Sequence, residues 1–294
     1  MGKCNICPRN CGADRSHGQL GFCRAPEDFL VAKSMLHEWE EPCISGKGGA
    51  GTIFFSGCNM HCVYCQNCAI SGGEIGSVMT EGELEKEIFS LIARGAECIE
   101  FVTPTHYTDS LARLLERIKP KIKLPIVWNS GGYEKVESLK MLDGLVDVYL
   151  PDFKYFDGEV AKNYSFAPDY AIVATAAIKE MSRQVGKPQF DDDGKLLRGL
   201  LVRHLVLPSH RGDSVEVLNL LEREIGHENM LLSLMSQYTP DFYVEINKDA
   251  AYKNLCRRLT SFEYDSVSKA AQKLGFNGYF QAHSSANKKY TPDF

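Results

Sequence analysis

No long hydrophobic run occurs in this sequence of 294 residues. A transmembrane helix needs about 20 consecutive, mostly apolar residues, and no stretch approaches that length. The first residues, Met1-Gly2-Lys3-Cys4, also lack the apolar core of a signal peptide. We therefore expect a cytoplasmic protein with no membrane partner.

Positive charge is not in excess either. Lys and Arg total 33 against 38 Asp and Glu, which gives a formal net charge of −5 at pH 7. Domains that bind nucleic acid carry a basic patch or stripe, and no long basic run occurs here. The composition thus argues against a nucleic-acid partner. At 44% hydrophobic residues, the chain is able to bury a full core.

Cysteine, in contrast, is abundant, with 11 residues in the chain. An intracellular compartment keeps thiols reduced, so metal binding explains this number better than disulfides do. The odd count also excludes a closed set of intramolecular disulfides. Most of the cysteines fall into two groups: Cys4, Cys7, Cys11 and Cys23 near the N-terminus, and Cys58, Cys62, Cys65 and Cys68 in one short loop.

The remaining pattern divides the chain in two. Residues 1–50 are rich in glycine and cysteine and show little periodicity, which predicts a metal-binding extension before a main domain of residues 51–294. In the main domain, short apolar runs alternate with amphipathic segments. The expected strands are 52–56, 98–103, 124–128, 146–150, 200–207 and 230–234; the expected helices include 81–94, 109–119, 134–141, 214–224, 249–260 and 265–274.

Strands that alternate with helices predict parallel βαβ units. Six such units match an α/β fold of the partial (β/α)6 barrel type. Ligands of such barrels bind at the carboxyl ends of the strands. Side chains that follow the predicted strands are therefore the first candidates for a functional site.

The second cysteine group lies at such a position. The loop Gly57-Cys58-Asn-Met-His-Cys62-Val-Tyr-Cys65 follows the first predicted strand directly, with C-x3-C-x2-C spacing. Cubane iron–sulfur clusters are held by cysteine thiolates, and a cluster with only three of them keeps one iron open to a further ligand. Cys68 follows at another C-x2-C interval, so the spacing alone leaves a closed four-thiolate site open as an alternative. We expect Cys68 to be a bystander thiol.

With Tyr64 as its aromatic residue, this loop resembles the C-x3-C-x-aromatic-C hallmark of the radical S-adenosylmethionine (SAM) superfamily. The likeness extends over nearly the whole chain. It is closest to the branch of pyruvate formate-lyase activating enzyme, and within it to uncharacterised relatives with an N-terminal cysteine motif. It rests on runs that include Phe101-Val-Thr-Pro-Thr-His106, Trp128-Asn-Ser-Gly-Gly-Tyr133, Val148-Tyr-Leu-Pro-Asp-Phe-Lys154 and Arg203-His-Leu-Val-Leu-Pro208.

The resemblance implies an enzyme in which Cys58, Cys62 and Cys65 hold a [4Fe–4S] cluster and SAM binds the open iron. A reductant such as flavodoxin or ferredoxin would supply one electron. SAM would then split into methionine and a 5′-deoxyadenosyl radical, which abstracts a hydrogen atom from the substrate.

The resemblance also implies where SAM lies. The run Ser71-Gly-Gly-Glu74 resembles the motif that holds the SAM amino group, but it stands before the first helix instead of after the second strand, so we interpret it as a turn. Asn129 replaces an aspartate of the activating enzymes, which removes one anionic ligand of their cation site. The expected cofactor contacts, the last of them by position alone, are Tyr64, Thr103, Thr105, His106, Asn129, Ser130, Asp152, Lys154, Arg203 and Gln237. Simple salt bridges at the barrel mouth are the alternative for the charged ones.

The N-terminal cysteines predict a second metal site. Cys4, Cys7, Cys11 and Cys23 offer four thiolates around a glycine-rich loop. A segment with so little apolar content needs a metal to fold. Four thiolates suit either tetrahedral zinc or a second [4Fe–4S] cluster, and the sequence leaves both open.

The substrate is less well defined than the chemistry. By resemblance it is a glycine on a partner glycyl-radical enzyme, with a small molecule or another peptide as the alternative. A non-catalytic iron–sulfur or zinc protein that transfers electrons or senses redox state is the alternative from another functional class.

Overall fold

The computed structural model describes residues 3–240, 250–281 and 294. A ten-stranded sheet forms its centre, with the strand order β10-β9-β8-β6-β5-β4-β2-β1-β3 and with β7 paired to β8. The strands predicted from the sequence form a continuous parallel run within this sheet. They are β2 (Ala50–Phe55), β4 (Ile99–Val102), β5 (Ile126–Ser130), β6 (Val148–Pro151), β8 (Leu196–Leu205) and β9 (Leu231–Met235).

This arrangement confirms the predicted α/β fold with a parallel barrel-type sheet. The barrel is partial in the part of the chain that the structure describes, because no strand pairing there joins the β10 edge (Gly278–Phe280) to the opposite β3 edge.

Two antiparallel strands extend the opposite edge. β1 (Phe29–His37) pairs with β2, and β3 (Ser77–Met79) pairs with β1. The predicted N-terminal extension, 1–50, thus includes a strand of the main sheet. The part of it that lies outside the sheet ends before Phe29, and the division of the chain into two domains at residue 50 stays a prediction.

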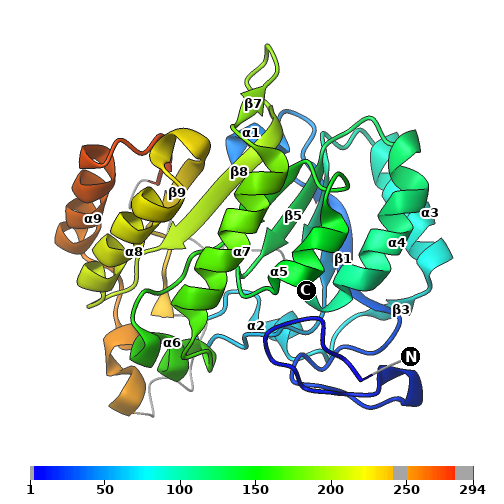
Figure 1. Cartoon of the computed structure of the whole chain (residues 1–294), viewed down its shortest axis with the longest axis horizontal. Helices are drawn as coiled ribbons and strands as arrows, with labels where there is room; N and C mark the ends of the chain where they lie inside the picture. The colour runs from blue at the N-terminus through cyan, green and yellow to red at the C-terminus, as the bar shows by residue number, and fades with distance from the viewer. Residues whose placement is uncertain (1–2, 241–249, 282–293) are drawn as a thin grey trace.

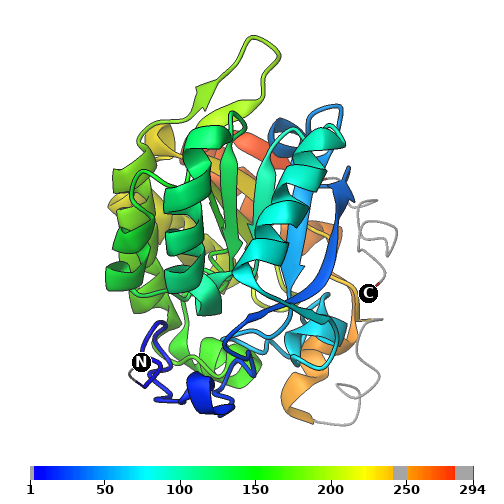
Figure 2. The ribbon, with the colours of Figure 1, turned by 90° about the vertical axis from the view of Figure 1, so that its right-hand side faces the viewer.

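Helices cover the outside of the sheet (Figures 1 and 2). They are α3 (Glu81–Ala93), α4 (Thr108–Ile118), α5 (Val136–Leu139), α6 (Gly158–Ser165), α7 (Tyr170–Val185), α8 (Arg211–Glu224) and α9 (Ser261–Lys273). Thr80 caps α3 as expected, in a capping box with Glu83. Of the helix expected at 249–260, Ala250–Cys256 is a 3-10 helix, and residue 249 lies outside the described residues.

The two faces of the sheet have different partners. Successive residues of a strand point to opposite faces, so Ile126 and Trp128 of β5 pack on the helices while Val127 packs inside the barrel. The short helix α1 (Pro42–Ser45) adds Cys43 and Ile44 to this inner cluster. Apolar side chains therefore fill the interior at one level, and polar side chains are left for the carboxyl ends of the strands.

Candidate active site

A cavity lies at the carboxyl ends of the six parallel strands. The end of each strand or the loop that follows it contributes to the cavity wall. The three loop cysteines line it together with most of the expected SAM contacts: Tyr64, Thr103, Asn129, Ser130, Asp152, Lys154, Arg203 and Gln237. Ser71–Glu74 is absent from this wall, as expected from the interpretation of that run as a turn.

Two expected contacts do not line this cavity, namely Thr105 and His106. They lie in a 3-10 turn, Thr105–Tyr107, that carries them behind the end of β4. The Thr105 hydroxyl donates to Oε1 of Glu134 at 3.2 Å. His106 is fully enclosed, and burial lowers the pKa of its imidazole to about 3. Both side chains are thus enclosed away from this cavity, and their role as SAM contacts stays a prediction.

The cluster loop is held tightly against the N-terminal segment. Gly57 has φ +84°, and a Cβ on it would meet the carbonyl oxygen of Cys23 at 2.4 Å. The Cys58 amide donates to that same carbonyl at 3.2 Å. A side chain at position 57 would break this contact, so the glycine before the first cysteine is required by the fold.

The three loop thiols suit a positively charged metal group. Burial and then the nearby Cys62 raise the pKa of Cys58. Burial, Cys62 and Cys58 raise the pKa of Cys65 in the same way. Thiolates that repel one another in a buried site need positive charge between them, which iron supplies. Cys68 is exposed and does not line the cavity, so the donor set fits a cluster with three thiolates.

Within residues 3–240 and 250–281, no group of three or more His, Cys, Asp or Glu side chains converges on a single-ion metal site. This holds for both cysteine groups.

A charged network forms the opposite wall of the cavity. Asp152 accepts from Lys154 Nζ at 2.6 Å and from Arg203 Nε at 2.9 Å. Burial alone would raise the pKa of Asp152, but the two cations outweigh it and lower that pKa. Burial likewise opposes the charge of Lys154, and Asp152 raises its pKa nonetheless. All three groups are therefore ionised, with one more positive charge than negative.

Asn129 connects this network to a buried acid pair. Its Oδ1 accepts from Arg203 Nη2 at 2.6 Å, and its Nδ2 donates to Glu100 Oε1 at 2.7 Å and to Glu40 Oε2 at 3.2 Å. An aspartate here could accept from Arg203 but could not donate to the two glutamate carboxyl groups, as the Asn129 amide does. The asparagine that replaces the aspartate of the activating enzymes is thus explained by its neighbours.

Sequence reasoning missed these glutamates. Burial and then Glu40 raise the pKa of Glu100 well above its usual value. Thr52 also donates to Glu100 at 2.7 Å. Glu100 could have been noticed, because it is a charged residue inside the apolar run Ile99–Val102. Such residues are almost never fully buried without a partner. No such pattern marks Glu40, because it lies in the loop before α1.

Backbone strain marks the end of β4. Thr103 has φ +56°, and its amide donates to the Asn129 carbonyl at 2.9 Å. A β-branched residue rarely adopts this left-handed conformation, and such strain gathers at functional sites.

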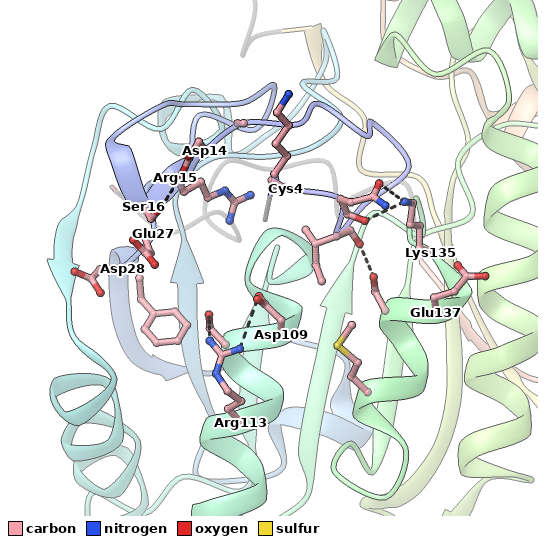
Figure 3. Close-up of a pocket in the computed structure, with 18 of the residues that line it drawn as sticks. Cys4, Asp14, Arg15, Ser16, Glu27, Asp28, Asp109, Arg113, Lys135 and Glu137 are labelled. Carbon is pink, nitrogen blue, oxygen red and sulfur yellow. Dashed lines mark hydrogen bonds and ion pairs between the residues drawn. The ribbon is translucent and has the colours of Figure 1, made fainter. Parts of the chain in front are cut away.

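The N-terminal segment that carries these cysteines is dark blue in Figure 2 and lies at the lower end of the molecule, and its Cys23 carbonyl accepts from the Cys58 amide of the cluster loop. Cys7 and Cys23 are buried, whereas Cys11 is exposed. Burial, with a smaller contribution from Cys23, raises the pKa of Cys7 to about 11. Arg15 Nη2 donates to Cys23 Sγ at 3.3 Å. A hollow of about 780 Å³ lies between this segment, α4 and α5, with Arg15, Asp109 and Lys135 among its lining residues (Figure 3).

Residues 44–161 match a family model described as a 4Fe-4S single cluster domain. An uncharacterized protein of Methanocaldococcus jannaschii is 29% identical over 283 residues, which cover 93% of this chain and 75% of that protein. Among solved structures, Streptococcus suis SuiB, bound to the precursor peptide SuiA, matches with a TM-score of 0.50 and 10% identity, over 76% of this chain and 46% of SuiB. A domain of pyruvate-formate lyase-activating enzyme from Bacteroides vulgatus matches with a TM-score of 0.46 and 10% identity, over 64% of this chain and all of that domain.

These comparisons agree with the iron–sulfur part of the resemblance stated from the sequence. Residues 44–161 are similar to a 4Fe-4S single cluster domain, and the fold is similar to that of SuiB. The matched domain contains the whole cysteine loop, from Cys58 to Cys65. Among the described residues, no helix is long and apolar enough to span a membrane.

Proposed function

We propose that the protein is a radical SAM enzyme. One observation carries the proposal: the three loop cysteines and the charged network Asp152–Lys154–Arg203 face each other across a single cavity at the carboxyl ends of the strands. Bound there, a reduced [4Fe–4S] cluster would supply the electron that cleaves SAM to methionine and a 5′-deoxyadenosyl radical, which abstracts a hydrogen atom from the substrate.

The protein side chains would bind and orient SAM. Lys154 is held at its place by Asp152, and its ammonium would neutralise the SAM carboxylate as a point charge. Arg203 is 17% exposed at the side chain, and its contact with Asp152 fixes its guanidinium in the cavity wall. Tyr64 packs edge-on against Tyr155 and Tyr238, at 6.3 and 6.2 Å between ring centroids, and would lie by the adenine.

The test is the formation of 5′-deoxyadenosine. Anaerobically reconstituted protein with dithionite and SAM should produce it, and Cys62→Ala should not. Cys68→Ala is the matched control, because this cysteine lies on the same loop but outside the cavity wall, and it should keep the activity. Failure of the intact, iron-loaded protein to cleave SAM would favour a non-catalytic iron–sulfur protein instead.

For the substrate, we propose a glycine of a partner glycyl-radical enzyme, with a small molecule or another peptide as the alternative. The basis for the first is the sequence likeness to the activating enzymes. Mixing the reduced enzyme and SAM with a glycyl-radical enzyme should give a doublet EPR signal. Absence of the doublet with every such enzyme of the source organism would exclude this substrate.

For the N-terminal group, we propose a second metal centre held by Cys4, Cys7, Cys11 and Cys23, either zinc or [4Fe–4S]. Two observations support it: Cys7 and Cys23 are buried, and Cys23, Cys4 and Cys11 lie close enough to Cys7 to raise the pKa of its thiol. Iron, sulfide and zinc analysis of a variant without Cys58, Cys62 and Cys65 should find one of these metals. A metal-free variant that stays folded would refute the second site. We also propose that a cytoplasmic reductant of the flavodoxin or ferredoxin class supplies the electron to the cluster.

A further inference from the structure

One of the three loop cysteines receives a hydrogen bond from a side chain. The Ser165 hydroxyl donates to the sulfur of Cys62 at 2.8 Å. Its oxygen lies 2.6 Å from the Tyr155 hydroxyl, which in turn lies 2.6 Å from the Tyr64 hydroxyl. The chain of hydroxyls is closed off from water, because Ser165 and Tyr155 are at most 1% exposed and Tyr64 is 7% exposed.

The number of protons available on these groups fixes the direction of the hydrogen bonds along the chain. A thiolate only accepts, and each hydroxyl has a single proton to donate. When Cys62 is a thiolate, the Ser165 hydroxyl donates its one proton to the sulfur. Its oxygen must then accept a hydrogen bond from Tyr155. Tyr155 then has no proton left for Tyr64, so the bond that Tyr155 donates to Tyr64 in the structure must reverse, with Tyr64 as the donor. Each hydroxyl thus polarises the next, and the combined dipole points its positive end at the sulfur of Cys62.

The donor is fixed in position from two sides. Ser165 is the last residue of α6, and Phe166 after it turns into the left-handed region with φ 54°. Arg9 Nη2 donates to the Ser165 carbonyl at 2.9 Å, while Arg9 Nε donates to the Asn59 carbonyl in the cluster loop at 2.7 Å. The same guanidinium therefore ties the backbone of Ser165 to the backbone of the cluster loop that carries Cys62.

We propose that the hydroxyl chain Tyr64–Tyr155–Ser165 raises the reduction potential of the cluster held by Cys62, and so makes it easier to reduce. The inference rests on the proposed function. Reduction adds one electron from an external reductant of the flavodoxin or ferredoxin class, and this negative charge spreads onto the sulfurs. Hydrogen bonds to the sulfurs stabilise the reduced form more than the oxidised form and are one of the known determinants of cluster potential.

The chain also ends at the SAM site, since Tyr64 lines the cavity while Ser165 reaches the cysteine from behind. Ser165 and Tyr155 are thus positioning residues that act through Cys62.

The experiment measures the midpoint potential of the reconstituted cluster by EPR-monitored titration without SAM, so it does not depend on turnover. Ser165→Ala should make the equilibrium constant for reduction about tenfold less favourable, which is about 59 mV for one electron. Tyr155→Phe should give a smaller shift of the same sign, because Ser165 then still donates but is no longer polarised. Ser165→Thr, which keeps the hydroxyl, should restore most of the potential.

Tyr149→Phe is the matched control. Its hydroxyl is also buried and donates to Gln184 at 2.6 Å, but it does not belong to the chain. It should leave the potential unchanged. Equal potentials in wild type, Ser165→Ala and Tyr155→Phe would overturn the proposal, even with 5′-deoxyadenosine still formed. If Ser165→Ala fails to load iron, Tyr155→Phe decides alone: a lowered potential supports the chain and an unchanged one refutes it. A wild-type protein without a cluster would instead contradict the proposed function.

Discussion

Arg9 connects the N-terminal segment to the cluster loop, and its removal should release that segment. Its guanidinium donates to the carbonyls of Asn59 at 2.7 Å and Ser165 at 2.9 Å, and also to that of Phe166. It lies over the Phe22 ring at 4.1 Å from the centroid. Arg9→Met should lose all of these contacts.

The expected cost follows from these contacts. A hydrogen bond from a charged donor contributes about 1.5 kcal/mol at the low end, which suits a half-exposed side chain. Two well-formed bonds then give about 3 kcal/mol, and the cation–π contact adds about 0.5 kcal/mol. Because each 1.4 kcal/mol is tenfold in an equilibrium constant, local opening should become roughly three-hundredfold more frequent.

Native-state hydrogen exchange at the Cys58 amide measures this opening, since that amide donates to the Cys23 carbonyl across the contact. It should exchange roughly three-hundredfold faster in Arg9→Met. Arg113→Met is the control, because Arg113 pairs only with α4 neighbours on the surface and should not change the rate. Unchanged exchange at Cys58 in Arg9→Met would refute the idea that Arg9 holds the two segments together.

Two further predictions concern stability. Thr80→Ala removes one half of the capping box of α3 and should lower the free energy of unfolding in urea by about 1 kcal/mol; no change would mean that the cap does not contribute. Burial and then Glu40 raise the pKa of Glu41 from 4.5 to about 7, so this carboxyl group binds a proton more tightly in the folded state than in the unfolded state. Protonation of Glu41 therefore stabilises the fold at low pH, and this stabilisation is lost as pH rises from about 4.5 to 7. Glu41→Gln keeps the acceptor for Ser233 and should stabilise the protein at pH 8 by up to about 3 kcal/mol, with no gain near pH 4, as urea unfolding at both pH values would show. Equal effects at the two pH values would contradict a raised pKa.

The parallel strands could be predicted because each is a short apolar run followed by an amphipathic helix. The antiparallel edge could not. β1, Phe29–His37, is only partly buried along its length and alternates poorly, so its pairing with β2 is decided by tertiary contacts.

The site residues likewise divide into those that the sequence could predict and those that it could not. The cysteine loop and the charged wall were predictable, since their residues stand directly after strands. Thr105 and His106 also follow a strand, but one 3-10 turn moves them away from the cavity. The acid pair of Glu40 and Glu100, and the contact of Ser165 with Cys62, join residues far apart in the sequence. No local pattern reports such contacts.

The central claim is that Cys58, Cys62 and Cys65 hold a cluster with one iron open to SAM. The Mössbauer spectrum of the ⁵⁷Fe-reconstituted protein, recorded with and without SAM, tests it most directly. SAM should change the signal of one iron per cluster, about one quarter of that cluster's iron, in wild type and in Cys68→Ala alike. A spectrum that SAM leaves unchanged, together with loss of the cluster in Cys68→Ala, would show a closed four-thiolate site and contradict the account.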